Sequence, residues 1–270
     1  MERKFSLAHL TVLGSTPAEM TYIAARCGYD FVSFRTIGLG TENEPQYPLA
    51  KNKAMYRETK TALVETGVQL LDIEMARIYD GVDPKVYLPA FEAAAELGGR
   101  HVLTTASTDN RNFIIDCFTQ LCDLAKPFGL TIDLEFITWY NVATFGQAAD
   151  IVREADCDNG GILVDTLHFN RSRVPLEELD QVPPERFHYA HVCDATKEIP
   201  FTKEGLIYTA REERLYLGEG DINVASILKR LPDIPYSLEI PHAVRAKELG
   251  YEEFARHCLQ TAKDYFANTL

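Results

Sequence analysis

The sequence predicts one α/β domain, a closed (β/α)8 barrel over residues 1–270. Eight apolar, strand-like segments alternate with segments that have the apolar spacing of helices, and the length suits a single barrel of this type. The main alternative is a doubly wound open sheet. That fold usually has a glycine-rich phosphate turn after its first strand, and here "VLGSTPAEM" has one glycine, which weighs against it.

Helix caps and terminal glycines mark the first four strand–helix units. In the first helix, Thr16 is a suitable cap, Pro17 suits the first helical position, and Gly28 suits the end. A long loop follows the second strand and ends near Pro48. The predicted strands are 5–13, 29–36, 68–78 and 100–107, and the helices are 16–28, 49–67, 84–99 and 112–129.

The last four units continue the same alternation. Runs such as "LTIDLEFIT" and "IPYSLEIP" have the length and composition of buried strands. Because parallel neighbours need crossover helices, the alternation predicts a parallel sheet. A long loop precedes the helix that leads to the last strand. The predicted strands are 130–138, 160–168, 186–195 and 234–241, and the helices are 142–156, a short one in "PLEELDQV", 222–232 and 245–266.

Composition narrows the classes of function and the partners. The net charge of −13 weighs against a nucleic-acid partner, because an acidic surface repels phosphodiester backbones. No stretch of about 18 apolar residues occurs, so we expect no membrane span. The N-terminal segment is better explained as a first strand than as a signal peptide. Six scattered cysteines without a C-x-x-C pair predict a reducing, cytoplasmic environment.

Polar residues stand near the ends of four successive strands in the second half. The two-residue side-chain period of a strand turns Glu135, Asp165 and Glu239 inward, and His191 has the same parity as Tyr189. The carboxyl ends of barrel strands form the active-site face. Three carboxylates and an imidazole around one point require a cation, so we expect one divalent metal ion. The residue types do not discriminate well among Mn²⁺, Mg²⁺, Co²⁺ and Zn²⁺.

Further polar and aromatic residues near these ends are candidates for catalysis or substrate binding. His168 follows Asp165 by three residues and can act from the loop as an acid or base, or remain a structural histidine. The candidates for substrate binding are three arginines and a tryptophan: Arg77, Trp139, Arg211 and Arg214. The arginines can hold a carboxylate or phosphate of the substrate, or form surface ion pairs. The tryptophan can form an apolar wall of the pocket, or pack at the barrel rim.

Two other positions and one loop are interpreted as mainly structural. Glu74 lies below the predicted rim, and His9, at the end of the first strand, is a weak candidate for the pocket. The turn "GEGDIN" has glycines before a helix, as phosphate loops do. Asp221 is more simply a helix cap, and Glu219 would repel a phosphate.

The site residues resemble a known superfamily. The series Glu135, Asp165-x-x-His168, His191, "LGEGDIN" and Glu239 is similar to the xylose isomerase-like TIM barrel superfamily of sugar isomerases and epimerases. The resemblance implies one divalent metal ion on Glu135, Asp165, His191 and Glu239, and proton abstraction next to a carbonyl. In its ketose epimerases and hydroxypyruvate isomerases, the two matching glutamates are also the acid/base pair. We therefore expect a metal-dependent isomerase or epimerase of a sugar-like hydroxy-ketone. Relatives often form dimers or tetramers, so we also expect a homo-oligomer.

A second resemblance supports an alternative function. Metal-dependent 3-dehydroshikimate dehydratases have an arginine at the end of the third strand, as Arg77 is, and a tryptophan four residues after the strand-five glutamate, as Trp139 is. They also have a strand like "VDTLH" and a basic loop like "TAREERLYLGEGD". A remote alternative is a non-catalytic sugar-binding protein. The zinc endonucleases of the superfamily need additional histidines, which the fourth and seventh predicted strands lack.

Overall fold

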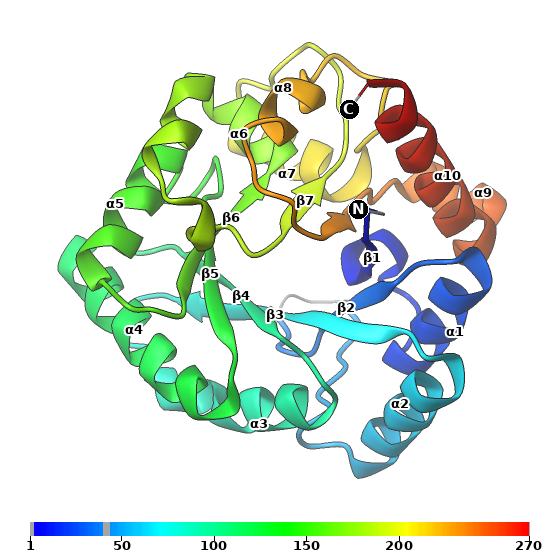
Figure 1. The fold of residues 1–270 in the computed structure, drawn as a ribbon, viewed down its shortest axis with the longest axis horizontal. Helices are drawn as coiled ribbons and strands as arrows, with labels where there is room; N and C mark the ends of the chain where they lie inside the picture. Colours follow the sequence, from blue (N-terminus) through cyan, green and yellow to red (C-terminus); the bar gives the residue numbers. More distant parts are fainter. Residues whose placement is uncertain (1–2, 40–43, 270) are drawn as a thin grey trace.

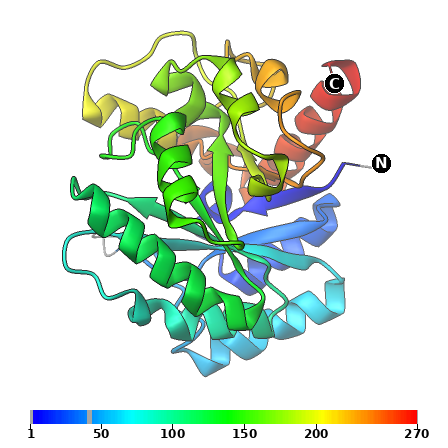
Figure 2. The ribbon, with the colours of Figure 1, turned by 60° about the vertical axis from the view of Figure 1, so that its left-hand side comes forward.

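The computed structural model describes residues 3–39 and 44–269. Its eight strands are parallel and pair in sequence order, and β1 pairs with β8 to close the barrel (Figure 1). Helices surround the strands on the outside (Figure 2). Helix α10 packs against α1, so the last helix lies beside the first. The predicted (β/α)8 barrel is confirmed.

The strands are shorter than predicted at several carboxyl ends. The segment predicted as 5–13 is a strand only to Ala8, because a 3-10 helix, His9–Val12, follows it. The segment predicted as 160–168 ends at Asp165, whose side chain caps the next helix. The strands are β1 Phe5–Ala8, β2 Phe31–Arg35, β3 Gln69–Ile78, β4 His101–Ala106, β5 Thr131–Glu135, β6 Gly160–Asp165, β7 Ala190–Val192 and β8 Tyr236–Leu238.

The helices follow the predicted order with four differences. Helix α6, directly after β6, and helix α7, in the long loop before β8, were not predicted. The segment "PLEELDQV" forms a 3-10 helix, Leu176–Gln181. The predicted helix 245–266 is broken at Gly250, whose φ of 74° lies in the left-handed region that favours glycine. The helices are α1 Pro17–Cys27, α2 Lys53–Thr66, α3 Leu88–Glu96, α4 Arg111–Ala125, α5 Phe145–Ala155, α6 Thr166–Ser172, α7 Lys203–Glu212, α8 Val224–Leu228, α9 Ala243–Leu249 and α10 Tyr251–Thr269.

The core has two layers that together position the strand ends. The larger layer fills the space between strands and helices, and a small apolar group lies in the barrel interior. Leu163 and Tyr189 of the inner group each precede a strand-end polar residue by two positions, so this layer supports Asp165 and His191 from below. The inner residues are Phe31, Leu71, Leu103, Leu163 and Tyr189.

Two expectations from composition can be compared with the structure. All six cysteines are free thiols. Within residues 3–39 and 44–269, no helix combines the length and the apolar character that crossing a membrane requires.

Candidate metal centre

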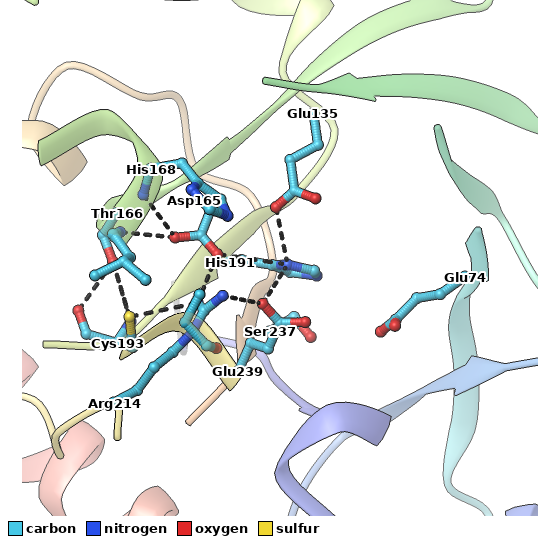
Figure 3. Close-up of polar contacts among 12 residues, drawn as sticks. Glu74, Glu135, Asp165, Thr166, His168, His191, Cys193, Arg214, Ser237 and Glu239 are labelled. Atoms are coloured by element: carbon cyan, nitrogen blue, oxygen red, sulfur yellow. Dashed lines mark hydrogen bonds and ion pairs between the residues drawn. The ribbon is translucent and has the colours of Figure 1, made fainter. Parts of the chain in front are cut away.

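The four predicted ligand residues lie together at the carboxyl ends of β5 to β8 (Figure 3). Glu135 ends β5, Asp165 ends β6, His191 is the central residue of β7, and Glu239 directly follows β8. Parallel pairing places Asp165 opposite His191, which explains how distant sequence positions meet. One ligand atom from each residue lies within 4.8 Å of the others, and all four residues are at most 4% exposed.

His191 is the centre of this group. Its Nδ1 lies 3.4 Å from Glu239 Oε2, 3.7 Å from Glu135 Oε1 and 4.0 Å from Asp165 Oδ2. Among the described residues, neither ring nitrogen has a hydrogen-bond partner, although the ring is fully buried. Ligands of a tetrahedral ion with bonds of about 2.1 Å stand roughly 3.4 Å apart. The spacing and the unsatisfied imidazole therefore fit a divalent metal ion held by these four side chains.

Arg214 neutralises part of the negative charge at this site. Its Nη1 lies 2.6 Å from Asp165 Oδ2 and its Nη2 lies 2.8 Å from Glu239 Oε2 (Figure 3). Its Nε donates to the carbonyl of Ala210, which fixes the guanidinium plane. Three carboxylates and one guanidinium leave a formal charge of −2, which is the charge that one divalent cation balances.

The electrostatic environment shifts the pKa values of the two glutamates of the site in opposite directions. Burial raises the pKa of Glu135 to about 7, against the opposing effect of His191. Burial also acts on Glu239, but Arg214 and His191 outweigh it and hold the pKa of Glu239 well below its usual value. Although burial disfavours its charged form, Glu239 and Glu135 raise the pKa of His191 well above its usual value. Without a cation, a proton therefore competes for the imidazole.

His168 lies beside the metal-ligand group. The sequence predicted that His168 acts from a loop, but the residue belongs to the short helix α6. Its Nδ1 is 3.3 Å from Thr138 Oγ1, and its ring and the Trp139 ring form a T-shaped pair at a centroid distance of 5.0 Å. Burial lowers the pKa of His168 to about 4, so its ring is neutral near pH 7. A neutral imidazole in this position is able to accept a proton.

A cleft above the strand ends brings together most of the predicted site residues. Trp139 and Arg211 both line it, as do Glu135, His168, Arg214 and Glu239. Among the described residues of β3, Met75 lines the cleft, and the predicted Arg77 does not. The Arg77 guanidinium instead lies 5.6 Å from the centre of the Tyr79 ring. Arg214 is in the lining, but its guanidinium is engaged by Asp165 and Glu239.

Asp194 has a structural role that the sequence did not suggest to us. Its Oδ2 accepts hydrogen bonds from the backbone N–H groups of Gly218 and Gly220, at 3.1 and 3.0 Å. Its Oδ1 accepts from Ile222 N at 3.0 Å and from Ala195 N at 2.8 Å. A carboxylate therefore engages N–H groups of "GEGDIN" that an external phosphate would otherwise contact. The following helix is capped by Asn223, so the prediction for Asp221 was wrong.

Two threonine side chains form hydrogen bonds with the backbone at the ends of the strands that carry ligand residues. Thr11 Oγ1 donates to the carbonyl of Leu238 and accepts from the N–H of Ile240, both at 2.8 Å. It therefore holds the backbone on either side of Glu239 in place. Thr166 Oγ1 forms the same pair of bonds with the carbonyl and N–H of Cys193. The only sequence signal for either role was a threonine next to a strand end.

A second cluster, His101, Asp133 and His188, lies at the opposite, amino-terminal ends of the strands. His188 Nδ1 is 2.6 Å from Asp133 Oδ1. Thr131 Oγ1 links the other two residues, at 2.7 Å from His101 Nδ1 and 2.7 Å from Asp133 Oδ2. Each of these groups already has a protein partner, so this cluster is satisfied without a metal ion. His9 is also satisfied: Nε2 lies 2.9 Å from the carbonyl of Ser15, and Nδ1 accepts from Arg35 N.

The sequence and the fold both have relatives. An inosose isomerase of Bacillus subtilis (strain 168) is 31% identical over 151 residues, which are 55% of this chain and 52% of that protein. A 3-dehydroshikimate dehydratase of Pseudomonas aeruginosa is 24% identical over 237 residues, which are 83% of this chain and 35% of that protein. The chain thus spans about half of the length of the first relative and about a third of the second.

The fold is similar to that of the IolI protein, which was solved with a zinc atom bound. The TM-score is 0.81 at 22% identity, with 99% of each chain covered. A family model described as xylose isomerase-like TIM barrel matches residues 22–261. Because this match includes most of the chain, the protein belongs to the xylose isomerase-like TIM barrel family.

Proposed function

We propose that the protein is a divalent-metal-dependent isomerase or epimerase that moves a proton next to the carbonyl of a sugar-like hydroxy-ketone. One observation carries the proposal: the ligand atoms of Glu135, Asp165, His191 and Glu239 converge within 4.8 Å beside a cleft. Similarity to an inosose isomerase supports the reaction class, and suggests a cyclic polyhydroxy ketone as the first substrate to test. Zinc is the first metal to test, because the IolI structure contains it.

The residues of the site would bind the metal ion, transfer protons or line the cleft in this reaction. Glu135, Asp165, His191 and Glu239 would hold the metal ion, which as a Lewis acid would polarise the substrate carbonyl. Glu135 and Glu239 line the cleft, so each is placed to take a proton from a substrate carbon or to return it. His168, neutral near pH 7, is placed to accept a proton from a substrate hydroxyl and then to return it. Trp139 packs against the His168 ring and lines the same cleft.

Deuterium exchange tests the proposal directly. The zinc-loaded protein is incubated with an inosose in deuterated water, and NMR measures exchange at the carbon next to the carbonyl. We expect exchange with formation of an isomer, and loss of both in Glu239→Gln. The matched control is Glu154→Gln, because Glu154 is half-exposed and pairs with Arg111 far from the cleft. Exchange that persists in Glu239→Gln would contradict the proposed role of this residue.

A dehydratase is the second candidate, and the cleft favours it in one respect. Arg211 lines the cleft and could hold a substrate carboxylate, which 3-dehydroshikimate has and an inosose lacks. Incubation of the metal-loaded protein with 3-dehydroshikimate would produce an aromatic acid, which near-ultraviolet absorbance detects. A metal-dependent signal that is lost in Glu239→Gln would assign the protein to the lyases. A flat trace with metal bound, together with deuterium exchange on the inosose, would support the isomerase.

A further inference from the structure

Two buried carboxylates on β3 face the candidate metal centre. Asp72 and Glu74 are fully buried, and one oxygen of each lies within 4.8 Å of the other and of a His191 ring nitrogen. In Figure 3, Glu74 lies on the opposite side of His191 from Asp165, with its carboxylate extended toward the group. Neither carboxylate belongs to the four-residue set described above.

Each of these carboxylates has one oxygen engaged and one free. Ser33 Oγ donates to Asp72 Oδ1, and Arg35 donates to Glu74 Oε2 from Nε at 2.9 Å and Nη2 at 2.7 Å. In the part of the chain that the structure describes, Asp72 Oδ2 and Glu74 Oε1 have no hydrogen-bond partner. Leaving a buried acceptor unsatisfied costs about 1–3 kcal/mol, and more for a charged group. The engaged oxygens fix both side chains, so the free oxygens cannot simply turn away.

His191 contributes a third unsatisfied atom. The nitrogen closest to Glu135, Asp165 and Glu239 is Nδ1, which leaves Nε2 on the far side of the ring. Nε2 is also without a hydrogen-bond partner among residues 3–39 and 44–269. A histidine that binds a metal through one nitrogen usually donates its other N–H to a carboxylate, a carbonyl or a water. Asp72 and Glu74 are the carboxylates grouped with His191 on β3, but they form no direct hydrogen bond with its ring.

We propose that a single trapped water molecule joins Asp72, Glu74 and His191. Two hydrogen bonds of about 2.8 Å that meet at a tetrahedral angle span roughly 4.6 Å, so one water can join residues whose ligand atoms all lie within 4.8 Å of one another. A second metal ion is less suitable, because Arg35 already balances the charge of Glu74 at 2.7 Å. The water accepts the His191 Nε2–H and donates to the two free carboxylate oxygens, so these three atoms gain partners.

The water has a consequence for the proposed metal function, on which this inference rests. It holds the proton of His191 on Nε2, and so directs the Nδ1 lone pair toward the metal ion. Asp72 and Glu74 thereby act as positioning residues. Burial raises the pKa of Asp72 to about 8, but water has two donors and two acceptors, so it serves this group whether or not Asp72 carries a proton.

Two measurements on the wild-type protein test the inference. A crystal structure near atomic resolution, with and without zinc, should show one water within hydrogen-bond distance of Asp72 Oδ2, Glu74 Oε1 and His191 Nε2. NMR of the zinc-loaded protein labelled with ¹⁵N-histidine should show His191 as the Nε2–H tautomer. An Nδ1–H tautomer, a metal ion at the water position, or well-defined density without a water there would overturn the inference.

Variants add a functional measurement. Asp72→Leu removes the acceptor and fills the water's place, so zinc affinity should fall about 10–100-fold. Asp72→Asn keeps room for the water and should retain most of the affinity. Asp133→Leu is a control matched in burial, because Asp133 is fully buried but lies at the other end of the barrel. Unfolding in urea identifies any variant that fails to fold.

The outcomes separate this inference from the proposed function. If Asp72→Leu is folded and binds zinc as tightly as the wild type, the positioning role is wrong. If the wild type itself binds no zinc, the proposed metal function fails. In that case the crystal structure without zinc still decides whether Asp72, Glu74 and His191 share a water.

Discussion

At the scale of single residues, a change at His168 should affect catalysis without affecting metal binding. It lines the cleft but lies outside the four-residue ligand set. We expect His168→Asn to lower kcat by about 10²–10⁴-fold, the usual contribution of an acid or base, and to leave zinc affinity unchanged. Steady-state kinetics on the substrate that the exchange experiment identifies, together with zinc titration, measure both. Equal kcat values for variant and wild type would show that His168 is structural.

The residue scale also shows why some side chains were predicted and others were not. The strand period was sufficient to place Glu135 and Asp165, because a short side chain on a strand must point to one face. Arginine side chains are long and flexible, so the position of the guanidinium depends on contacts that strand parity does not describe. Arg77 therefore lies over Tyr79, and Arg214 contacts ligand residues where we had expected it to bind substrate.

At the scale of elements, the Thr11 hydroxyl couples the 3-10 helix after β1 to the end of β8. Thr11→Val leaves a buried carbonyl and a buried N–H unsatisfied next to Glu239. We expect this variant to lose about 2–4 kcal/mol of unfolding free energy and some zinc affinity, whereas Thr11→Ser keeps both. Urea unfolding and zinc titration measure the two effects. Thr119→Val is the control, since the Thr119 hydroxyl bonds only within its own helix; a Thr11→Val loss no larger than the control's would refute the coupling.

The loop 217–223 depends on the absence of a side chain at Gly220. A Cβ atom there would lie 2.3 Å from Ala195 O and 2.4 Å from Asp194 Oδ1. Neither atom is at the end of a flexible chain, so we expect Gly220→Ala to lower the unfolding free energy by about 2–3 kcal/mol. In Gly146→Ala, the nearest atom is Glu178 Oε2 at 3.2 Å, which can move away. Similar urea midpoints for these two variants would contradict this view of the loop.

Element boundaries were the least predictable part of the fold. The order of strands and helices followed from apolar periodicity, and the caps of α1 from Thr16, Pro17 and Gly28. The ends of strands depended on side-chain hydrogen bonds that periodicity does not contain. β6 ends where Asp165 begins to cap α6, with bonds to the N–H groups of Leu167 and His168. The same aspartate that marks the site thus also ends the strand.

At the scale of the whole molecule, buried neutral histidines make stability depend on pH. Burial lowers the pKa values of His9 and His101 to about 4, from 6.5 in the unfolded chain. Between pH 6.5 and 4 the unfolded chain therefore binds more protons than the folded one, and stability falls as the pH falls. His9→Gln should reduce the slope of unfolding free energy against pH by about one proton in this range. Urea unfolding at a series of pH values measures the slope, and an unchanged slope would argue against a neutral, buried His9.

The closed barrel also supports a proposal about domain organisation. We propose that residues 1–270 form one domain, because β1 pairs with β8 and α10 packs against α1, so the two halves of the chain complete one barrel. The sequence predicted this closure only from the number of strand–helix units. Pairing between the first and last strands depends on contacts more than 200 residues apart in the chain, which no local pattern contains.

The central claim is that Glu135, Asp165, His191 and Glu239 together hold one divalent metal ion, and zinc titration by calorimetry tests it most directly. We predict one zinc ion per wild-type chain and a loss of at least about 100-fold in affinity in His191→Asn. His101→Asn is the control, because His101 belongs to the other histidine–carboxylate cluster, and it should bind zinc like the wild type. A folded wild-type protein that binds no zinc, or a folded His191→Asn variant that binds zinc as tightly as the wild type, would contradict the account.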